Sequence, residues 1–162
     1  MPPTKPVLYF AYGSNMNSED LKIWCRAHQT EIRLKNPKVA SLPDYKLAFT
    51  HNSKRRSGGT ADIVREAGGI VWGVLFETDE ASLRNIDKKE GWTGDLSQSA
   101  YKRIEVTVLV DGKLVPDVIN YEVIKKAKYR PNKAYLDVIV KGAEDHRLPE
   151  AYIENLRKLS GG

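Results

Sequence analysis

An alternating segment in the second half of the chain restricts the fold more than any other feature of the sequence. Between positions 103 and 110, apolar side chains at even positions alternate with mostly polar ones at odd positions, which predicts a strand with one buried face. Asp111-Gly112 supplies a two-residue turn, and we expect the return strand over about residues 114–123, with an edge or bulge near Pro116. The chain therefore contains at least one antiparallel hairpin.

Other strand-like segments precede this hairpin and gather in the middle of the chain. Pro37 and Pro43 favour turns between two of them. Residues 51–59 are polar and rich in glycine and include a Lys-Arg-Arg run, so we expect an exposed loop there. The strands are predicted at residues 7–12, 32–34, 45–49, 60–64 and 69–76.

Four helices are expected around these strands, each with a recognisable start or stop signal. They are one capped by Asn17 or Ser18, one from Asp79 to about Glu90 with Gly91 as its stop, one from about Asn132 with Gly142 as its stop, and one from Pro149. The strands cluster instead of alternating strictly with helices. The sequence therefore predicts an α+β fold with a mostly antiparallel sheet or barrel, rather than a doubly wound α/β fold.

The bulk properties indicate one small domain. A chain of 162 residues, 41% of them hydrophobic, can bury one sizeable core, so we predict a single domain over residues 1–159 and a flexible tail over 160–162. The lone Cys25 excludes an intrachain disulfide and favours a reducing compartment, the cytoplasm. The first six residues lack a signal-peptide core, and no segment approaches the ~20 apolar residues of a membrane span.

The first candidate for chemistry is the turn at residues 12–15, Tyr-Gly-Ser-Asn, where the first strand ends and a helix follows. The first amide hydrogens of a helix have no partner inside it, so they suit a substrate carboxylate or an oxygen that gains negative charge. Gly13 permits close backbone approach. The same residues are also common in ordinary turns, and spacing alone does not decide between the two interpretations.

The second candidate is Glu90, at the predicted end of a helix. Lys88 and Lys89 favour its ionised form, whereas burial and the negative end of the helix would raise its pKa toward the range of a general acid/base. Many glutamates at such positions are simply solvated. The eight tyrosines of the chain could likewise be ordinary core rings or could line a polar pocket.

Other classes of site find little support. Cys25 and the three histidines lack the spacing of metal ligands, so we predict no metal and no cofactor. The net charge of +5 favours an anionic ligand but is modest for a nucleic-acid binder. Lys54-Arg55-Arg56 could meet a phosphate, yet no aromatic residues interleave with it to stack bases. We therefore expect no nucleic-acid partner.

An ordered set of short motifs resembles the γ-glutamyl cyclotransferase family, also called AIG2-like. Each motif alone is weak, but together they cover nearly the whole chain in order. They are YFAYGSNM at residues 9–16, SGGTADI at 57–63, VWGV at 71–74, IDKKEG at 86–91 and YLDVIVKGA at 135–143. The resemblance implies a mixed, mostly antiparallel sheet that closes into a small β-barrel with flanking helices, and a possible homodimer.

The resemblance also implies a reaction and its residues. The α-amine of a γ-glutamyl group attacks its own γ-carbonyl and releases 5-oxoproline, with Glu90 as the general acid/base and no cofactor or metal. At Tyr101 the correspondence is weaker, because residues 92–100 depart from the family pattern in length and composition. The substrate-binding residues that the family resemblance implies are Tyr9, Phe10, Ala11, Tyr12, Gly13, Ser14, Asn15, Tyr121 and Tyr135.

Two other functions use the same fold and stay open at the level of sequence. One is a γ-glutamylamine cyclotransferase that acts on an isopeptide or an antibiotic precursor, which needs the same glutamate and the same turn. The other is a non-catalytic module that binds γ-glutamyl compounds, against which the retention of Glu90 and of the complete turn argues. The identity of the leaving group distinguishes a γ-glutamylamine cyclotransferase from a cyclotransferase that acts on γ-glutamyl dipeptides.

Overall fold

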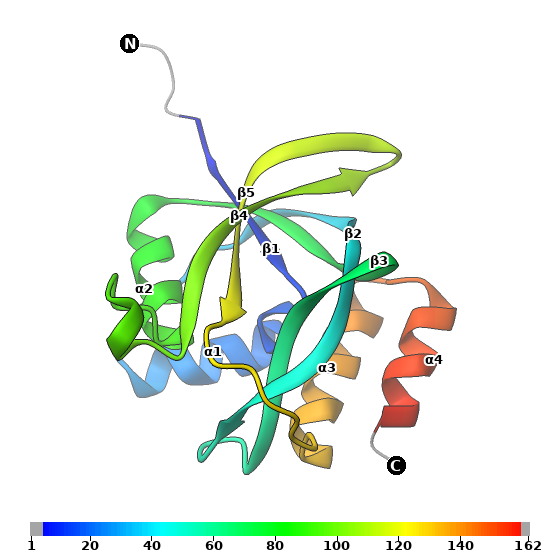
Figure 1. Ribbon diagram of the computed structural model, residues 1–162. Helices are drawn as coiled ribbons and strands as arrows, with labels where there is room; N and C mark the ends of the chain where they lie inside the picture. The colour runs from blue at the N-terminus through cyan, green and yellow to red at the C-terminus, as the bar shows by residue number, and fades with distance from the viewer. Residues whose placement is uncertain (1–4, 160–162) are drawn as a thin grey trace.

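A computed structural model describes residues 5–159 as an α+β fold (Figure 1). The predicted 160–162 tail and the first four residues lie outside this part of the chain. The order of the elements is β1 Val7–Ala11, the 3₁₀ turn η1 Ser14–Met16, α1 Ser18–Ala27, β2 Lys35–Ser53, β3 Gly58–Thr78, α2 Glu80–Glu90, the 3₁₀ turn η2 Leu96–Gln98, β4 Tyr101–Val110, β5 Lys113–Val123, α3 Lys133–Asp145 and α4 Glu150–Lys158.

The strands of residues 5–159 form a closed barrel in the order β1-β3-β2-β4-β5. All neighbours are antiparallel except β1 and β5, which meet in parallel where Tyr9 lies opposite Ile119. This confirms the mixed, mostly antiparallel sheet that the family resemblance implies. Figure 1 shows α1 and α2 against one side of the barrel and α3 and α4 against another. Because the barrel is closed, each of its strands has a neighbouring strand on both sides.

The β2–β3 hairpin differs from the sequence prediction. The chain around residues 32–34 is not a strand, and the turns expected at Pro37 and Pro43 lie inside one long strand, β2. Register shifts between Lys35 and Lys38 and between Pro43 and Tyr45, together with a positive φ of 64° at Asp44, show that β-bulges accommodate the two prolines. The two strands predicted at 60–64 and 69–76 are likewise parts of the single strand β3.

The expected loop at residues 51–59 is also shorter than predicted. Strand β2 continues to Ser53 and β3 begins at Gly58, so only the turn at residues 54–57 connects them. Gly59 pairs in the ladder and its N–H donates to the carbonyl of Arg130, 2.9 Å away. Polar composition predicted a loop here because it does not report that residues 51–53 pair with residues 58–60 across a tight turn.

The β4–β5 hairpin and the helix starts agree with the prediction. Asp111 and Gly112 both have positive φ, and Asp117 next to Pro116 forms the expected bulge, with φ of 61°. The side chain of Asn17 accepts a hydrogen bond from the N–H of Asp20 at 2.9 Å and so caps α1. The other predicted caps also stand at the helix starts, namely Asp79 for α2, Asn132 for α3 and Pro149 for α4.

The end of α2 fixes the position of Glu90. Gly91 follows the helix in the left-handed conformation, with φ of 75°, and its N–H donates back to carbonyls of the last turn. A residue with a side chain would be strained at this φ. The helix therefore stops at Glu90, as predicted, and the carboxylate lies on the final turn.

Gly142 does not end α3, contrary to the prediction, since the helix continues to Asp145. It marks a close contact between backbones. A Cβ atom placed on Gly142 would lie 2.8 Å from the backbone N of Asn17 and 2.8 Å from the carbonyl carbon of Met16. The absence of a side chain lets α3 pack directly on η1, the turn that follows β1.

We predict that Gly142→Ala destabilises the protein, although the same change inside a helix normally stabilises it by about 1 kcal/mol. Overpacking against the backbone of η1 should cost about 1–3 kcal/mol of unfolding free energy, measured by urea denaturation. Lys141→Ala, on the exposed side of the same helix, removes only a surface ion pair to Asp145 and should cost under about 0.5 kcal/mol. A stabilised Gly142→Ala variant would contradict this account.

Candidate active site

A cavity of about 310 Å³ opens where β1 ends and η1 begins. Its walls come from this turn, the end of α2, the turn between β2 and β3, strands β4 and β5, and α3. Most of the residues that the family resemblance implies meet here, although they are distant in the sequence. Those that line the cavity are Tyr9, Tyr12, Gly13, Ser14, Asn15, Glu90, Tyr121 and Tyr135.

Phe10 and Ala11 are the two residues of that set that do not line the cavity. Both are fully buried in the core of the barrel, and Ala11 pairs with Val74 of β3. A Cβ atom on Gly73 would lie 2.3 Å from the carbonyl oxygen of Ala11 and 2.8 Å from the Phe10 ring, so β1 and β3 pack tightly at this point. The two residues hold the strand that delivers the turn to the cavity.

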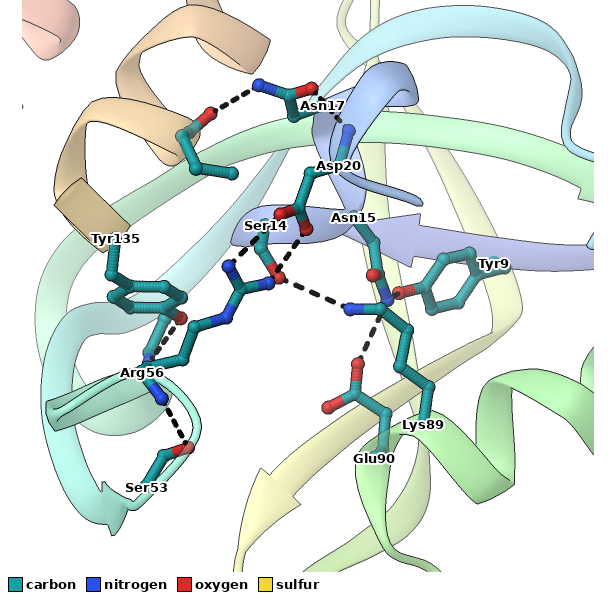
Figure 2. Close-up of polar contacts among 12 residues, drawn as sticks. Tyr9, Ser14, Asn15, Asn17, Asp20, Ser53, Arg56, Lys89, Glu90 and Tyr135 are labelled. Atoms are coloured by element: carbon teal, nitrogen blue, oxygen red, sulfur yellow. Dashed lines mark hydrogen bonds and ion pairs between the residues drawn. The ribbon is translucent and has the colours of Figure 1, made fainter. Parts of the chain in front are cut away.

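One hydrogen bond joins the two candidate features of the sequence. Asn15 Nδ2 donates to Glu90 Oε1 at 2.9 Å and to the hydroxyl of Tyr9 at 2.7 Å, as Figure 2 shows. The Asn15 side chain is only 5% exposed, so it cannot turn freely toward solvent. Its Oδ1 is buried and has no hydrogen-bond partner among residues 5–159. The contact therefore ties the turn after β1 to the carboxylate at the end of α2.

Burial raises the pKa of the Glu90 carboxyl above its ordinary value. The charge of Lys89, the hydrogen bond from Asn15 and the charge of Arg56 act in the opposite direction but do not cancel the desolvation. The sequence predicted this competition without its outcome. A carboxylate whose pKa is raised is a better proton acceptor, which suits a general acid/base.

Lys89 also belongs to the cavity. Its Nζ donates to the hydroxyl of Ser14 at 3.4 Å (Figure 2). Burial lowers the pKa of the ammonium group, while the neighbouring charge of Glu90 raises it. The sequence predicts Lys89 only as a neighbour of Glu90, because consecutive positions in the chain do not show that both side chains enter the same cavity.

Arg56 is a second residue that sequence reasoning missed. It was expected in an exposed loop, but its guanidinium donates two hydrogen bonds to the carboxylate of Asp20, at 3.0 and 2.7 Å. Both side chains are largely buried, and the guanidinium lies over the Tyr135 ring, 5.1 Å from its centroid (Figure 2). The contact ties the β2–β3 turn to α1. No spacing in the sequence connects the two residues, which are 36 positions apart.

The tyrosine hydroxyls around the cavity are mostly engaged by the protein. Tyr12 donates to the carbonyl of Tyr121 at 2.7 Å, and Tyr121 donates to the carboxylate of Asp87. The hydroxyl of Tyr135 accepts from the N–H of Ala61 at 2.9 Å. Tyr101, the uncertain position of the family pattern, lines the same cavity and donates to the Ala61 carbonyl at 2.7 Å. These rings form a rigid wall.

Within residues 5–159, no group of three or more His, Cys, Asp and Glu side chains is placed to hold a metal ion. No helix in the same part of the chain is long and apolar enough to cross a membrane.

Comparison with known proteins identifies the family. A sequence model of the AIG2-like family matches residues 70–156. A γ-glutamylcyclotransferase of Bos taurus is 33% identical over 94% of this chain and 78% of its own length, and that of Homo sapiens is 32% identical over 98% and 81%. A solved γ-glutamyl cyclotransferase structure superimposes with a TM-score of 0.77 and 31% identity, over 94% of this chain and 87% of that one.

The fold and the site therefore define a β-barrel enzyme, and among residues 5–159 Glu90 is the one carboxylate that lines its polar cavity. The chain belongs to the AIG2-like family, among the γ-glutamylcyclotransferases. This confirms the family resemblance read from the ordered motifs.

We predict that Glu90→Gln stabilises the protein at neutral pH. Because the folded pKa of Glu90 is raised, the folded protein binds its proton more tightly than the unfolded chain does. Stability should therefore fall as the pH rises from the ordinary value of 4.5 through the raised one. Gln does not ionise, so Glu90→Gln avoids this loss. At pH 8 its unfolding free energy should exceed that of the native protein by about 1 kcal/mol.

Urea denaturation at pH 8 and near pH 4 would measure this difference. The gain should disappear near pH 4, where the native carboxyl is protonated in both states. Glu105→Gln, at an exposed position of β4, serves as the control and should change stability little at either pH. A Glu90→Gln variant less stable than the native protein at pH 8 would contradict the account.

Proposed function

We propose that this protein releases 5-oxoproline from γ-glutamyl amides or dipeptides, with Glu90 as the general acid/base. The observation that carries the proposal is the contact between Asn15 and Glu90 in the cavity. It joins the turn that would hold the glutamyl group to a carboxylate whose pKa burial has raised. Membership of a family whose relatives are named γ-glutamylcyclotransferases supports the same reaction.

The reaction balances without any other reactant. The α-nitrogen forms a bond to the γ-carbonyl carbon, and the bond from that carbon to the leaving nitrogen breaks. Starting from an ammonium group, the attacking nitrogen loses two protons to become the lactam N–H, and the leaving nitrogen gains two. Glu90 accepts protons from one and returns them to the other, so it ends the cycle as it began. Holding the substrate folded supplies a large part of the rate.

The charges of the cavity suit the glutamyl group of the substrate, which carries an ammonium and a carboxylate. Glu90 would accept a hydrogen bond from the amine. Lys89, at the Ser14 side of the turn, would attract the α-carboxylate together with the first amides of η1. The amine is thereby brought to the base.

Two finer points also remain proposals. A cytoplasmic location is supported by the lone cysteine, Cys25, which is free and buried. A homodimer, implied by the family resemblance, can be tested by analytical ultracentrifugation at several protein concentrations. Neither point affects the chemistry assigned to Glu90.

The test of the function is the release of 5-oxoproline, followed by liquid chromatography over γ-glutamyl dipeptides, glutathione and γ-glutamyl-ε-lysine. We expect Glu90→Gln to remain folded and to lose about 10²- to 10⁴-fold in kcat, because an amide cannot carry the proton. Glu105→Gln should retain native activity.

Near-native turnover by Glu90→Gln would overturn the role of Glu90. Turnover of γ-glutamyl-ε-lysine alone would favour a γ-glutamylamine cyclotransferase. A thermal shift with 5-oxoproline but no turnover of any substrate would favour a binding module.

A further inference from the structure

Arg55 stands at the mouth of the same cavity and forms no ion pair with any of residues 5–159. It lines the cavity from the turn between β2 and β3, yet it is an exposed residue, which places it at the open side. Within residues 5–159 its guanidinium makes no hydrogen bond or ion pair. Partial burial and the charge of Arg56 lower the pKa of Arg55, and the charge of Asp20, which raises it, offsets only part of this effect.

The other charges that line the cavity are already balanced. Arg56 is held by the carboxylate of Asp20 in a two-bond ion pair. Lys89 and Glu90 are neighbours with opposite charges, and each stabilises the ionised form of the other. His51, which also lines the cavity, has its pKa lowered by burial, which favours the neutral imidazole. One positive charge therefore remains, that of Arg55.

The turn that carries Arg55 is fixed in place. The N–H of Arg56 donates to the hydroxyl of Ser53 at 3.2 Å, and that of Ser57 donates to the carbonyl of Lys54 at 3.3 Å. The Arg56–Asp20 pair anchors the same turn to α1, as Figure 2 shows. The backbone of Arg55 thus needs no rearrangement to present a cation at the cavity mouth, which reduces the entropic cost of binding an anion there.

Resting on the proposed function, we infer that Arg55 binds a carboxylate on the leaving group of the substrate. The glutamyl group is a zwitterion and matches the Glu90 and Lys89 pair. A γ-glutamyl amino acid carries one further negative charge, the carboxylate of the amino acid that departs. The unpaired cation at the mouth matches that charge, and its planar guanidinium can hold a carboxylate by two hydrogen bonds. A neutral leaving amine leaves Arg55 without a partner.

The test compares two substrates that differ only in this charge, γ-glutamyl-L-alanine and γ-glutamyl-L-alaninamide. For the native protein we expect kcat/KM to favour the acid by about 10- to 100-fold, because a charge-assisted contact is lost in the amide. Arg55→Gln should reduce this preference to within about threefold, mainly by slowing turnover of the acid. Arg55→Lys keeps the charge and should retain part of the preference.

Lys54→Gln is the matched control, since Lys54 is an exposed cation of the same turn and does not line the cavity. Lys54→Gln should keep the native ratio of kcat/KM for the acid to kcat/KM for the amide. This result would distinguish a local contact of Arg55 from a general effect of net charge. Calorimetric binding of both substrates to Glu90→Gln gives a second measurement that does not depend on turnover. In that background, Arg55→Gln should again weaken binding of the acid selectively.

The possible failures are distinguishable. If the native protein converts both substrates with equal efficiency, or if Arg55→Gln keeps the native ratio, the role of Arg55 is overturned while the proposed reaction stands. If the folded native protein releases 5-oxoproline neither from these two substrates nor from any other γ-glutamyl compound of the panel, the proposed function itself fails, and the inference fails with it.

Discussion

The double pairing of β1 in the barrel is the constraint on which the site depends. The strand is only five residues long, but it bonds to β3 along its length and meets β5 at Tyr9. Phe10 and Ala11 are buried against β3, where Gly73 allows the backbones to approach. A strand held on both sides cannot shift its register without moving every side chain to the opposite face. The turn that follows β1 is therefore delivered to one fixed position.

Two other contacts complete the frame around that turn. Gly142 lets α3 pack on the backbone of η1, and the left-handed Gly91 ends α2 with Glu90 on its last turn. Asn15 then joins the two segments by its hydrogen bond to the carboxylate. The site is assembled from rigid elements, and this kind of support keeps catalytic groups within the narrow geometry that chemistry requires.

The raised pKa of Glu90 links function to stability. A carboxylate that is kept from water destabilises the folded state when it is charged, and the hydrogen bond from Asn15 and the charge of Lys89 offset only part of this cost. Such a cost is typical of sites where reactivity depends on desolvation. Each cation around the cavity either has a counter-ion or is placed where a substrate carboxylate can supply one.

The sequence by itself determined the local features of this protein. Alternation, caps and turn residues predicted the β4–β5 hairpin, the start of each helix and the stop at Gly91, because these depend on neighbouring residues. The ordered motifs indicated the family. Only the tertiary structure decided that β2 and β3 are long bulged strands, that Glu90 is desolvated, and that Arg55, Arg56 and Lys89 line one cavity. The placements of Glu90, Arg56 and Lys89 depend on contacts between residues 36 to 75 positions apart, such as Arg56 with Asp20 and Glu90 with Asn15, and the two long strands depend on their pairing with each other. Local spacing carries no record of such contacts, because burial and pairing arise only when the barrel closes.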